Sequence, residues 1–247
     1  MNKTLAIIPA RYASTRFPGK PLADLGGKSM IERVYRQVAS CVEVDEILVA
    51  TDDVRILDAV HAFGAEAVLT SENCFSGTDR CAEVLAGNPR NWEYVINVQG
   101  DEPFIQPGQI SQLIACMRET SADAATLIKK ITSEEDLANP NVVKAVVSGS
   151  GRALYFSRSP IPYLRDGRAG SHISQHCFYR HLGIYAFRAS VLPVLAALPP
   201  GILEQAESLE QLRWLEAGYS IYTSVTEHAS IGIDTPEDLE KAKAWLN

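Results

Sequence analysis

Short apolar runs alternate with amphipathic segments through the first hundred residues of the chain. Apolar runs of strand length occur at 5–8, 46–51, 68–70 and 94–98, and helical patterns lie between them at 29–40, 54–63 and 78–85. The segment 29–40 opens with a capping-box pattern, Ser29 followed three residues later by Glu32. This alternation predicts a mostly parallel sheet with helices on both of its faces.

The second half of the chain is less regular. Strand-like runs at 124–131, 142–147 and 153–156 follow one another with no long helix between them, and a fourth run covers 181–187. Such sequential strands predict a smaller antiparallel extension of the sheet. Helical patterns at 208–217 and 236–245 close the chain, which carries no internal repeat or low-complexity linker, so a single domain is expected.

Composition narrows the class of protein. The 247 residues are 46% hydrophobic and carry a net charge of −7, so a nucleic-acid partner is not expected, because such proteins usually present a basic surface. No apolar run approaches the length of a membrane span or of a secretory signal. The five cysteines are odd in number and form no C-x-x-C pair, which favours free thiols and a cytoplasmic location.

A basic loop follows the first predicted strand, in the stretch "IIPARYASTRFPGKPL". Its cations are Arg11, Arg16 and Lys20, against an acidic background. A loop at the carboxyl end of a parallel strand is where open α/β sheets bind ligands, and its backbone N–H groups suit an anion. It is not a Walker A loop, because Ser14 replaces the first glycine and Pro21 the final Ser/Thr. The alternative is a solvated basic loop with no ligand.

Two carboxylates lie where strands are expected to end. In "VINVQGDEP", Gly100 permits a tight backbone path before Asp101, which is a natural Mg²⁺ ligand together with substrate phosphates, although an ordinary acidic turn has the same composition. In "IGIDTPEDLEKA", Thr235 is expected to cap the last helix. The preceding Asp234 is therefore not needed as a cap, although it can simply favour the helix N-terminus.

A fourth segment, "CFSGTDRCAE", begins the helix expected at 78–85. Ser76 and Gly77 precede this helix, and Thr78 and Arg80 lie in its first turn. Such a turn can hydrogen-bond the edge of a nucleotide base. It can equally be a plain helix start.

Nine segments occur in the order found in one enzyme family. They are "IPARYASTRFPGKPL", "ATDD", "SGTDR", "NVQGDEP", "NPNVVKAV", "ALYFSRSPIPY", "RHLGIYAFR", "SLEQLRWLEAG" and "GIDTPEDLEKA". Through them the chain resembles the 3-deoxy-manno-octulosonate cytidylyltransferases, or CMP-Kdo synthetases. The resemblance implies a Rossmann-like nucleotidyltransferase sheet over residues 1–247, with an extension in the second half that serves dimerisation and sugar binding.

The resemblance also implies the reaction: CTP and the acid sugar Kdo (3-deoxy-manno-octulosonate) give CMP-Kdo and pyrophosphate with Mg²⁺, in a cytoplasmic homodimer that supplies lipopolysaccharide synthesis. Implied catalytic residues are Arg11, Lys20 and Asp101, and implied metal ligands are Asp101 and Asp234. The implied nucleotide-binding residues are Arg11, Ser14, Arg16, Lys20, Ser76, Thr78, Arg80 and Gln99. The implied sugar-binding residues are Gln99, Arg158, His181, Tyr185, Glu210 and Gln211.

Several alternatives stay open on sequence alone. Gln211 lies three residues after Ser208, so the pair can form a capping box of the helix at 208–217 instead of lining a pocket, and His181 can simply pack at a strand start. A CMP-sialate synthetase is the nearest rival function. A nucleotide-sensing module without turnover is a more distant one, and it would not need the carboxylates of Asp101 and Asp234.

Overall fold

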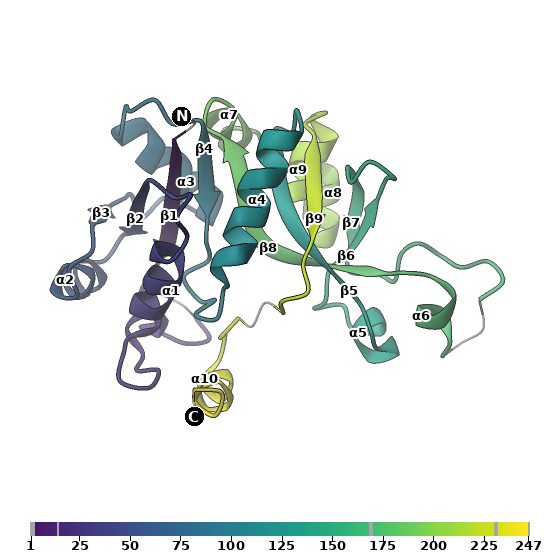
Figure 1. The fold of residues 1–247 in the computed structure, drawn as a ribbon, viewed down its shortest axis with the longest axis horizontal. Helices are drawn as coiled ribbons and strands as arrows, with labels where there is room; N and C mark the ends of the chain where they lie inside the picture. The colour runs from purple at the N-terminus through teal and green to yellow at the C-terminus, as the bar shows by residue number, and fades with distance from the viewer. Residues whose placement is uncertain (1–2, 14, 168–169, 230–231, 247) are drawn as a thin grey trace.

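A single mixed sheet organises the part of the chain that the structure describes (Figure 1). The structure is a computed structural model and describes residues 3–13, 15–167, 170–229 and 232–246. Within these ranges the strands are β1 (Thr4–Ala10), β2 (Glu46–Thr51), β3 (Ala67–Leu69), β4 (Tyr94–Asn97), β5 (Ala124–Lys130), β6 (Lys144–Val147), β7 (Ala153–Ser157), β8 (Tyr179–Arg188) and β9 (Ile221–Val225). They run in the order β3-β2-β1-β4-β8-β5-β9, with β6 and β7 beside β8.

The sheet divides into a parallel part and an antiparallel part. Strands β1 to β4 are parallel to one another, and β5 is parallel to β9. Strand β8 runs antiparallel between β4 and β5 and also pairs with the β6–β7 hairpin. The predicted mostly parallel sheet with an antiparallel extension is therefore confirmed, although the antiparallel part begins inside the sheet instead of at its edge.

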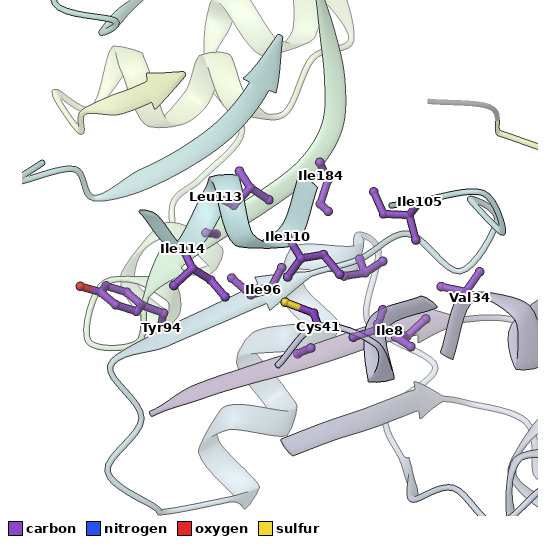
Figure 2. Packing of buried hydrophobic residues seen from close by; sticks show 14 of the residues in the cluster. Ile8, Val34, Cys41, Tyr94, Ile96, Ile105, Ile110, Leu113, Ile114 and Ile184 are labelled. Atoms are coloured by element: carbon purple, nitrogen blue, oxygen red, sulfur yellow. The ribbon is translucent and has the colours of Figure 1, made fainter. Parts of the chain in front are cut away.

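Helices cover both faces of the sheet. Helices α1 (Met30–Ala39), α2 (Val54–Ala62) and α4 (Pro107–Glu119) bury their apolar sides on one face, where Ile8 of β1 and Ile96 of β4 meet Ile110 of α4 (Figure 2). Helices α3 (Gly77–Gly87), α7 (Leu192–Ala196) and α9 (Gln211–Glu216) pack on the other face. The remaining helical segments are η1 (Lys20–Leu22), α5 (Glu134–Ala138), α6 (His172–Gln175), α8 (Ile202–Glu207) and α10 (Pro236–Lys243). In the described ranges, none of these helices has the length and apolarity needed to cross a membrane.

The expected helix starts are present where capping chemistry was visible. Ser29 accepts a hydrogen bond from the Glu32 N–H at the start of α1. Thr235 and Asp238 form a reciprocal capping box at the start of α10. A serine or threonine oxygen satisfies N–H groups that have no partner within the helix, which fixes where the helix begins.

The prediction of one helix over 208–217 is wrong for its first three residues, because helix α9 covers only Gln211–Glu216. Ser208 has a φ of 52°, a left-handed conformation that ends α8, and its N–H donates to the Glu204 carbonyl. Helix α9 begins only at Gln211, so the capping box between Ser208 and Gln211, left open as an alternative, does not form. A chain in the left-handed region cannot continue an α-helix, and the break turns α9 relative to α8.

Gly100 brings the turn after β4 against the end of β1. A β-carbon at this position would lie 2.7 Å from the Pro9 carbonyl oxygen, which is closer than such atoms approach. Strands β1 and β4 are neighbours, so this contact brings the loops that follow them to the same edge of the sheet.

We predict that Gly100→Ala lowers the free energy of unfolding by about 1–3 kcal/mol, because the added methyl group forces a backbone shift. Gly108→Ala is the matched control, since nothing lies within 4 Å of a β-carbon there. Gly108 is in the first turn of α4, and the free energy of unfolding of Gly108→Ala should equal that of the wild type or be slightly higher. Urea denaturation checks both variants, and equal stability of Gly100→Ala and wild type would contradict the close approach.

Candidate active site

One pocket at the carboxyl edge of the parallel strands gathers most of the predicted phosphate-binding, base-binding and metal-binding residues. Its walls come from the loop after β1, the segment before α3, the turn after β4 and the residue before α10. The predicted site residues that line it are Arg11, Arg16, Lys20, Ser76, Arg80, Gln99, Asp101 and Asp234. Ser14 lies outside the described residues.

An ion-pair cluster lies at the centre of this pocket. The Lys20 Nζ donates to Asp101 Oδ2 at 2.7 Å and to Asp234 Oδ1 at 3.1 Å. The Arg16 guanidinium lies 3.2 Å from the same Asp234 oxygen. Both carboxylates therefore reach a single cation, although they are far apart in the sequence.

Local structure explains how these three segments meet. Gly19, with a φ of 72°, lets its N–H return to the Tyr12 carbonyl at 3.0 Å, which closes the basic loop in front of η1. The Ile233 N–H donates to the Asp101 carbonyl at 2.9 Å, so the C-terminal segment is joined directly to the turn after β4. The Asp238 carboxylate accepts from the Asp234 N–H at 3.3 Å, which holds that residue at the start of α10.

The start of α3 has two functions in the structure. Ser76 caps the helix by accepting from the Asp79 N–H, so the plain helix start is confirmed, yet the same serine lines the pocket. Thr78 is buried, and its hydroxyl donates to Glu210 Oε2 at 2.8 Å. This bond ties the segment expected to bind the base to the segment expected to bind the sugar.

A second polar group lies beside this pocket on β8 and α9. It contains His181, Tyr185, Glu210 and Gln211. Asn97, opposite Tyr185 in the sheet, accepts a hydrogen bond from the Gln99 amide at 3.1 Å and so links the group to the first pocket.

Three buried atoms of this group have no hydrogen-bond partner among the described residues. They are Tyr185 Oη, Glu210 Oε1 and Gln211 Nε2. Buried polar atoms are nearly always paired, so unpaired ones of both donor and acceptor type fit a ligand with several hydroxyl groups. Burial raises the pKa of the Glu210 carboxyl, while hydrogen bonds from Thr78 and Ser76 lower it.

Arg158 follows β7 and is not among the residues that line the first pocket. Its guanidinium donates to the main-chain carbonyls of Pro140, Glu207 and Ser208. Its own N–H donates to the Glu207 carboxylate at 2.9 Å. The arginine thus holds the α8–α9 junction, and two of its five N–H donors remain for another partner.

The donor set of the pocket fits a magnesium ion. In the described ranges no group of three or more His, Cys, Asp or Glu side chains is placed to enclose a metal. Mg²⁺, however, is commonly bound by one or two carboxylates together with substrate phosphates, and Asp101 and Asp234 already share one cationic partner.

Two functional neighbours were missed by the sequence reasoning. Asp52 accepts a hydrogen bond from the Arg80 guanidinium, and Thr126 bonds to the His181 ring. Asp52 had a visible signal, because it directly follows β2, a strand of the parallel part. Thr126 lies within an apolar strand, and only the pairing of β5 with β8 reveals its partner.

Comparison with known proteins identifies the family. The model of a family described as Cytidylyltransferase matches residues 5–224. The chain therefore belongs to the cytidylyltransferase family, which agrees with a pocket lined by cations and carboxylates at the edge of an α/β sheet.

Individual relatives narrow the identification. A 3-deoxy-manno-octulosonate cytidylyltransferase of Parabacteroides distasonis is 52% identical over 250 residues, covering 100% of this chain and 99% of the relative. The enzyme of the same name from Porphyromonas gingivalis is 53% identical, covering 99% and 97%. Within its family, the chain belongs with the 3-deoxy-manno-octulosonate cytidylyltransferases.

Solved structures agree with this placement. A CMP:2-keto-3-deoxy-manno-octonic acid synthetase complexed with CTP is 44% identical and superposes with a TM-score of 0.92, covering 99% of this chain and 98% of the other. A 4-diphosphocytidyl-2C-methyl-D-erythritol synthase from Anaerococcus prevotii, at 16% identity and a TM-score of 0.65, shares the fold.

The protonation state of His181 follows from its surroundings. Burial lowers the pKa of the imidazole to about 3, and the ring packs against Phe156 and Tyr185 with centroid distances of 5.0 and 5.4 Å. The Thr126 hydroxyl, with one proton, lies 2.8 Å from the Ile184 carbonyl and 3.0 Å from His181 Nε2. When the hydroxyl donates to that carbonyl, it accepts from Nε2–H, which selects the Nε2–H tautomer; the lowered pKa keeps that ring neutral at pH 7.

We predict a loss of stability below pH 6.5 that depends on His181. The imidazole of His181 takes up a proton near the ordinary histidine pKa in the unfolded chain but not in the folded chain. The contribution of His181 to the free energy of unfolding is therefore complete above pH 6.5 and is lost as the pH falls towards 3. Between pH 7.5 and 5.5, the free energy of unfolding should fall less steeply in His181→Gln than in the wild type. The difference in slope should be at most about 1 kcal/mol per pH unit. Urea denaturation at three pH values measures it.

His228→Gln is the control for this series. His228 is exposed, so its removal should leave the wild-type pH dependence intact. If the wild type and His181→Gln follow the same pH dependence, the buried neutral imidazole is refuted.

Proposed function

We propose that this chain transfers the cytidylyl group of CTP to Kdo and releases pyrophosphate. The observation that carries the proposal is the pocket in which the cations of the loop after β1 meet the carboxylates of Asp101 and Asp234. Relatives of about 50% identity along the whole chain bear the name of this activity. The product is an activated acid sugar for lipopolysaccharide synthesis.

The chemistry is an in-line displacement. The anomeric 2-hydroxyl of Kdo attacks the α-phosphorus of CTP and loses its proton to solvent. The new C–O–P linkage forms, and the bond to the bridging oxygen of pyrophosphate breaks. Negative charge grows on the phosphoryl oxygens and on the leaving group. Arg11, Arg16 and Lys20 oppose that charge, and positioning with electrostatic stabilisation supplies most of the rate in reactions of this kind.

Magnesium is part of the proposal. Asp101 and Asp234 would hold the ion together with phosphate oxygens, and the ion would neutralise charge on the triphosphate. Lys20 uses two of its three N–H donors on these carboxylates in the structure, which leaves one for a phosphate oxygen.

The sugar would bind to the second polar group, which His181, Tyr185, Glu210 and Gln211 form. Tyr185, Glu210 and Gln211 offer the unpaired buried donors and acceptors that a polyhydroxy acid can satisfy. Gln99 lies between this group and the loop after β1. The two N–H donors of the Arg158 guanidinium that have no partner among the described residues would bind the sugar carboxylate.

A homodimer is proposed as the working form. The antiparallel extension carries exposed apolar side chains, among them Leu154 and Tyr163, which are 57% and 86% exposed. Sedimentation equilibrium should give about twice the 27.0 kDa chain mass. A single species of the chain mass at micromolar concentration would contradict the dimer.

Pyrophosphate release across four nucleoside triphosphates and several acid sugars tests the activity. We expect turnover with CTP, Kdo and Mg²⁺, and little with sialic acid in place of Kdo. Preferred turnover with sialic acid would favour a CMP-sialate synthetase, and binding of CTP without turnover on any sugar would favour a nucleotide-sensing module.

We predict that Asp101→Asn and Asp234→Asn each lower turnover by at least 100-fold at limiting Mg²⁺, because an amide is a far poorer ligand for a hard cation. Melting temperatures should change little, since both side chains are partly exposed. Mn²⁺ affinity in the presence of CTP, measured by electron paramagnetic resonance, should fall in parallel.

Glu237→Gln is the matched control for the metal prediction. It removes an exposed carboxylate from the first turn of α10 that does not line the pocket, so rate and Mn²⁺ affinity should stay at wild-type values. Unchanged Mn²⁺ affinity in both aspartate variants would remove these residues from the metal site.

A further inference from the structure

The Arg80 guanidinium is buried at the wall of the pocket and is fixed by two side chains outside the predicted site. Arg80 is only 3% exposed and lines the pocket beside Ser76 and Gly77. Its Nη2 donates to Asp52 Oδ2 at 2.8 Å, and its Nη1 donates to the Thr70 hydroxyl.

The sheet places these two partners side by side. Asp52 directly follows β2 and Thr70 directly follows β3, and the last residues of the two strands, Thr51 and Leu69, are partners in the parallel register. Thr70 is held twice to the Thr51 carbonyl, through its N–H at 2.8 Å and its hydroxyl at 3.1 Å. The positions of both acceptor residues are therefore set by the ends of two neighbouring strands.

An arginine held in this way has a defined orientation. The guanidinium is planar, with five N–H donors in a rigid fork and no acceptor. Once Nη1 and Nη2 each have a fixed acceptor, the plane of the group and the directions of its other donors are fixed as well. The buried charge is also paired, as a buried charge must be to avoid a large desolvation cost.

A fixed group that only donates can discriminate between pyrimidines. Cytosine presents acceptors at O2 and N3, whereas uracil presents a donor, N3–H, at the second of these positions. A donor aimed at N3 therefore gains a hydrogen bond with cytosine and meets another donor with uracil. If Arg80 were free to turn, it could use the uracil carbonyl oxygens instead, and the discrimination would weaken.

We propose that Asp52 and Thr70 are positioning residues that set the preference of this enzyme for CTP over UTP, by fixing the orientation of the Arg80 guanidinium. The proposal rests on the proposed function, because it assigns Arg80 to the base of the nucleotide substrate. Neither residue touches the substrate in this scheme.

The test is the ratio of kcat/KM for CTP to kcat/KM for UTP. In Asp52→Asn and in Thr70→Val this ratio should fall at least tenfold, through a higher KM for CTP, while the KM for Kdo stays near wild type. Thr70→Ser keeps the hydroxyl and should keep the ratio. A melting curve of each variant separates loss of orientation from loss of fold.

Glu46→Gln is the matched control. Glu46 begins the same strand, β2, and pairs with Arg90 at the opposite end of the strand from the pocket. Its removal also breaks an acid–arginine pair on β2, but it should leave the CTP-to-UTP ratio unchanged.

The outcomes separate this proposal from the proposed function. An equal fall in CTP and UTP turnover in both Asp52→Asn and Thr70→Val, with the ratio unchanged, would show a merely structural role and overturn the proposal. If the wild type turns over neither nucleotide, the proposed function fails. In that case calorimetry of CTP and UTP binding to the same variants still tests the role of Asp52 and Thr70. A loss of the preference for CTP would support the proposal, and an unchanged ratio of the two dissociation constants would overturn it.

Discussion

The ammonium group of Lys20 joins three segments that are distant in the chain, and the shape of the pocket depends on this contact. It binds one carboxylate 81 positions later and another 214 positions later. Its side chain is only 13% exposed, whereas the two acids are 31% and 44% exposed. Without a cation between them, Asp101 and Asp234 would repel each other at short range in a partly desolvated site, so the three groups are stable only together.

The rest of the fold is arranged so that this contact can form. Gly100 lets the turn after β4 pass directly over the Pro9 carbonyl, and the Ile233 N–H binds the Asp101 carbonyl. The capping box of α10 then holds Asp234 at the helix start. Figure 1 shows α10 below α1, and its Leu239 and Ala242 pack with Leu25 and with Met30 of α1. This packing keeps a residue near the C-terminus at the edge of the parallel strands.

The sequence predicted those elements whose signals lie within a few neighbouring residues. The parallel strands, α1 and α10 follow from apolar runs and capping residues that lie within a few positions of one another. Helix α4 was not predicted, although Ile110, Leu113, Ile114 and Met117 recur at helical spacing after Pro107, so a signal was present. The break at Ser208 had none, because left-handed helix ends usually carry glycine or asparagine. The convergence of Asp101 and Asp234 on Lys20 also could not follow from spacing. Both acids were expected at strand ends, and the family resemblance assigned them to one metal.

The Thr78–Glu210 bond explains why the two halves of the site cannot be treated as independent. Thr78 lies in the first turn of α3, in the wall expected to face the base, and Glu210 lies beside α9, in the wall expected to face the sugar. One oxygen of the Glu210 carboxylate is committed to Thr78, and only the other is without a partner among the described residues. A shift of α3 therefore moves an acceptor of the group proposed to bind the sugar.

The charge distribution explains how an acidic chain can bind a highly anionic substrate. The net charge of −7 belongs to the chain as a whole, and at physiological salt an exposed charge is largely screened beyond about 8 Å. Arg11, Arg16 and Lys20 line the pocket, so in the proposed function they would oppose the phosphates at contact distance, where screening is weak. Arg80 adds little net charge, because Asp52 pairs with it. Arg16 and Lys20 also face carboxylates, those of Asp101 and Asp234, so the three loop cations keep a formal excess of one positive charge over these two acids. The Arg80–Asp52 pair carries no net charge, and its guanidinium contributes direction instead of charge. Affinity for the phosphates and selectivity for the base can therefore be set by different arginines in one pocket.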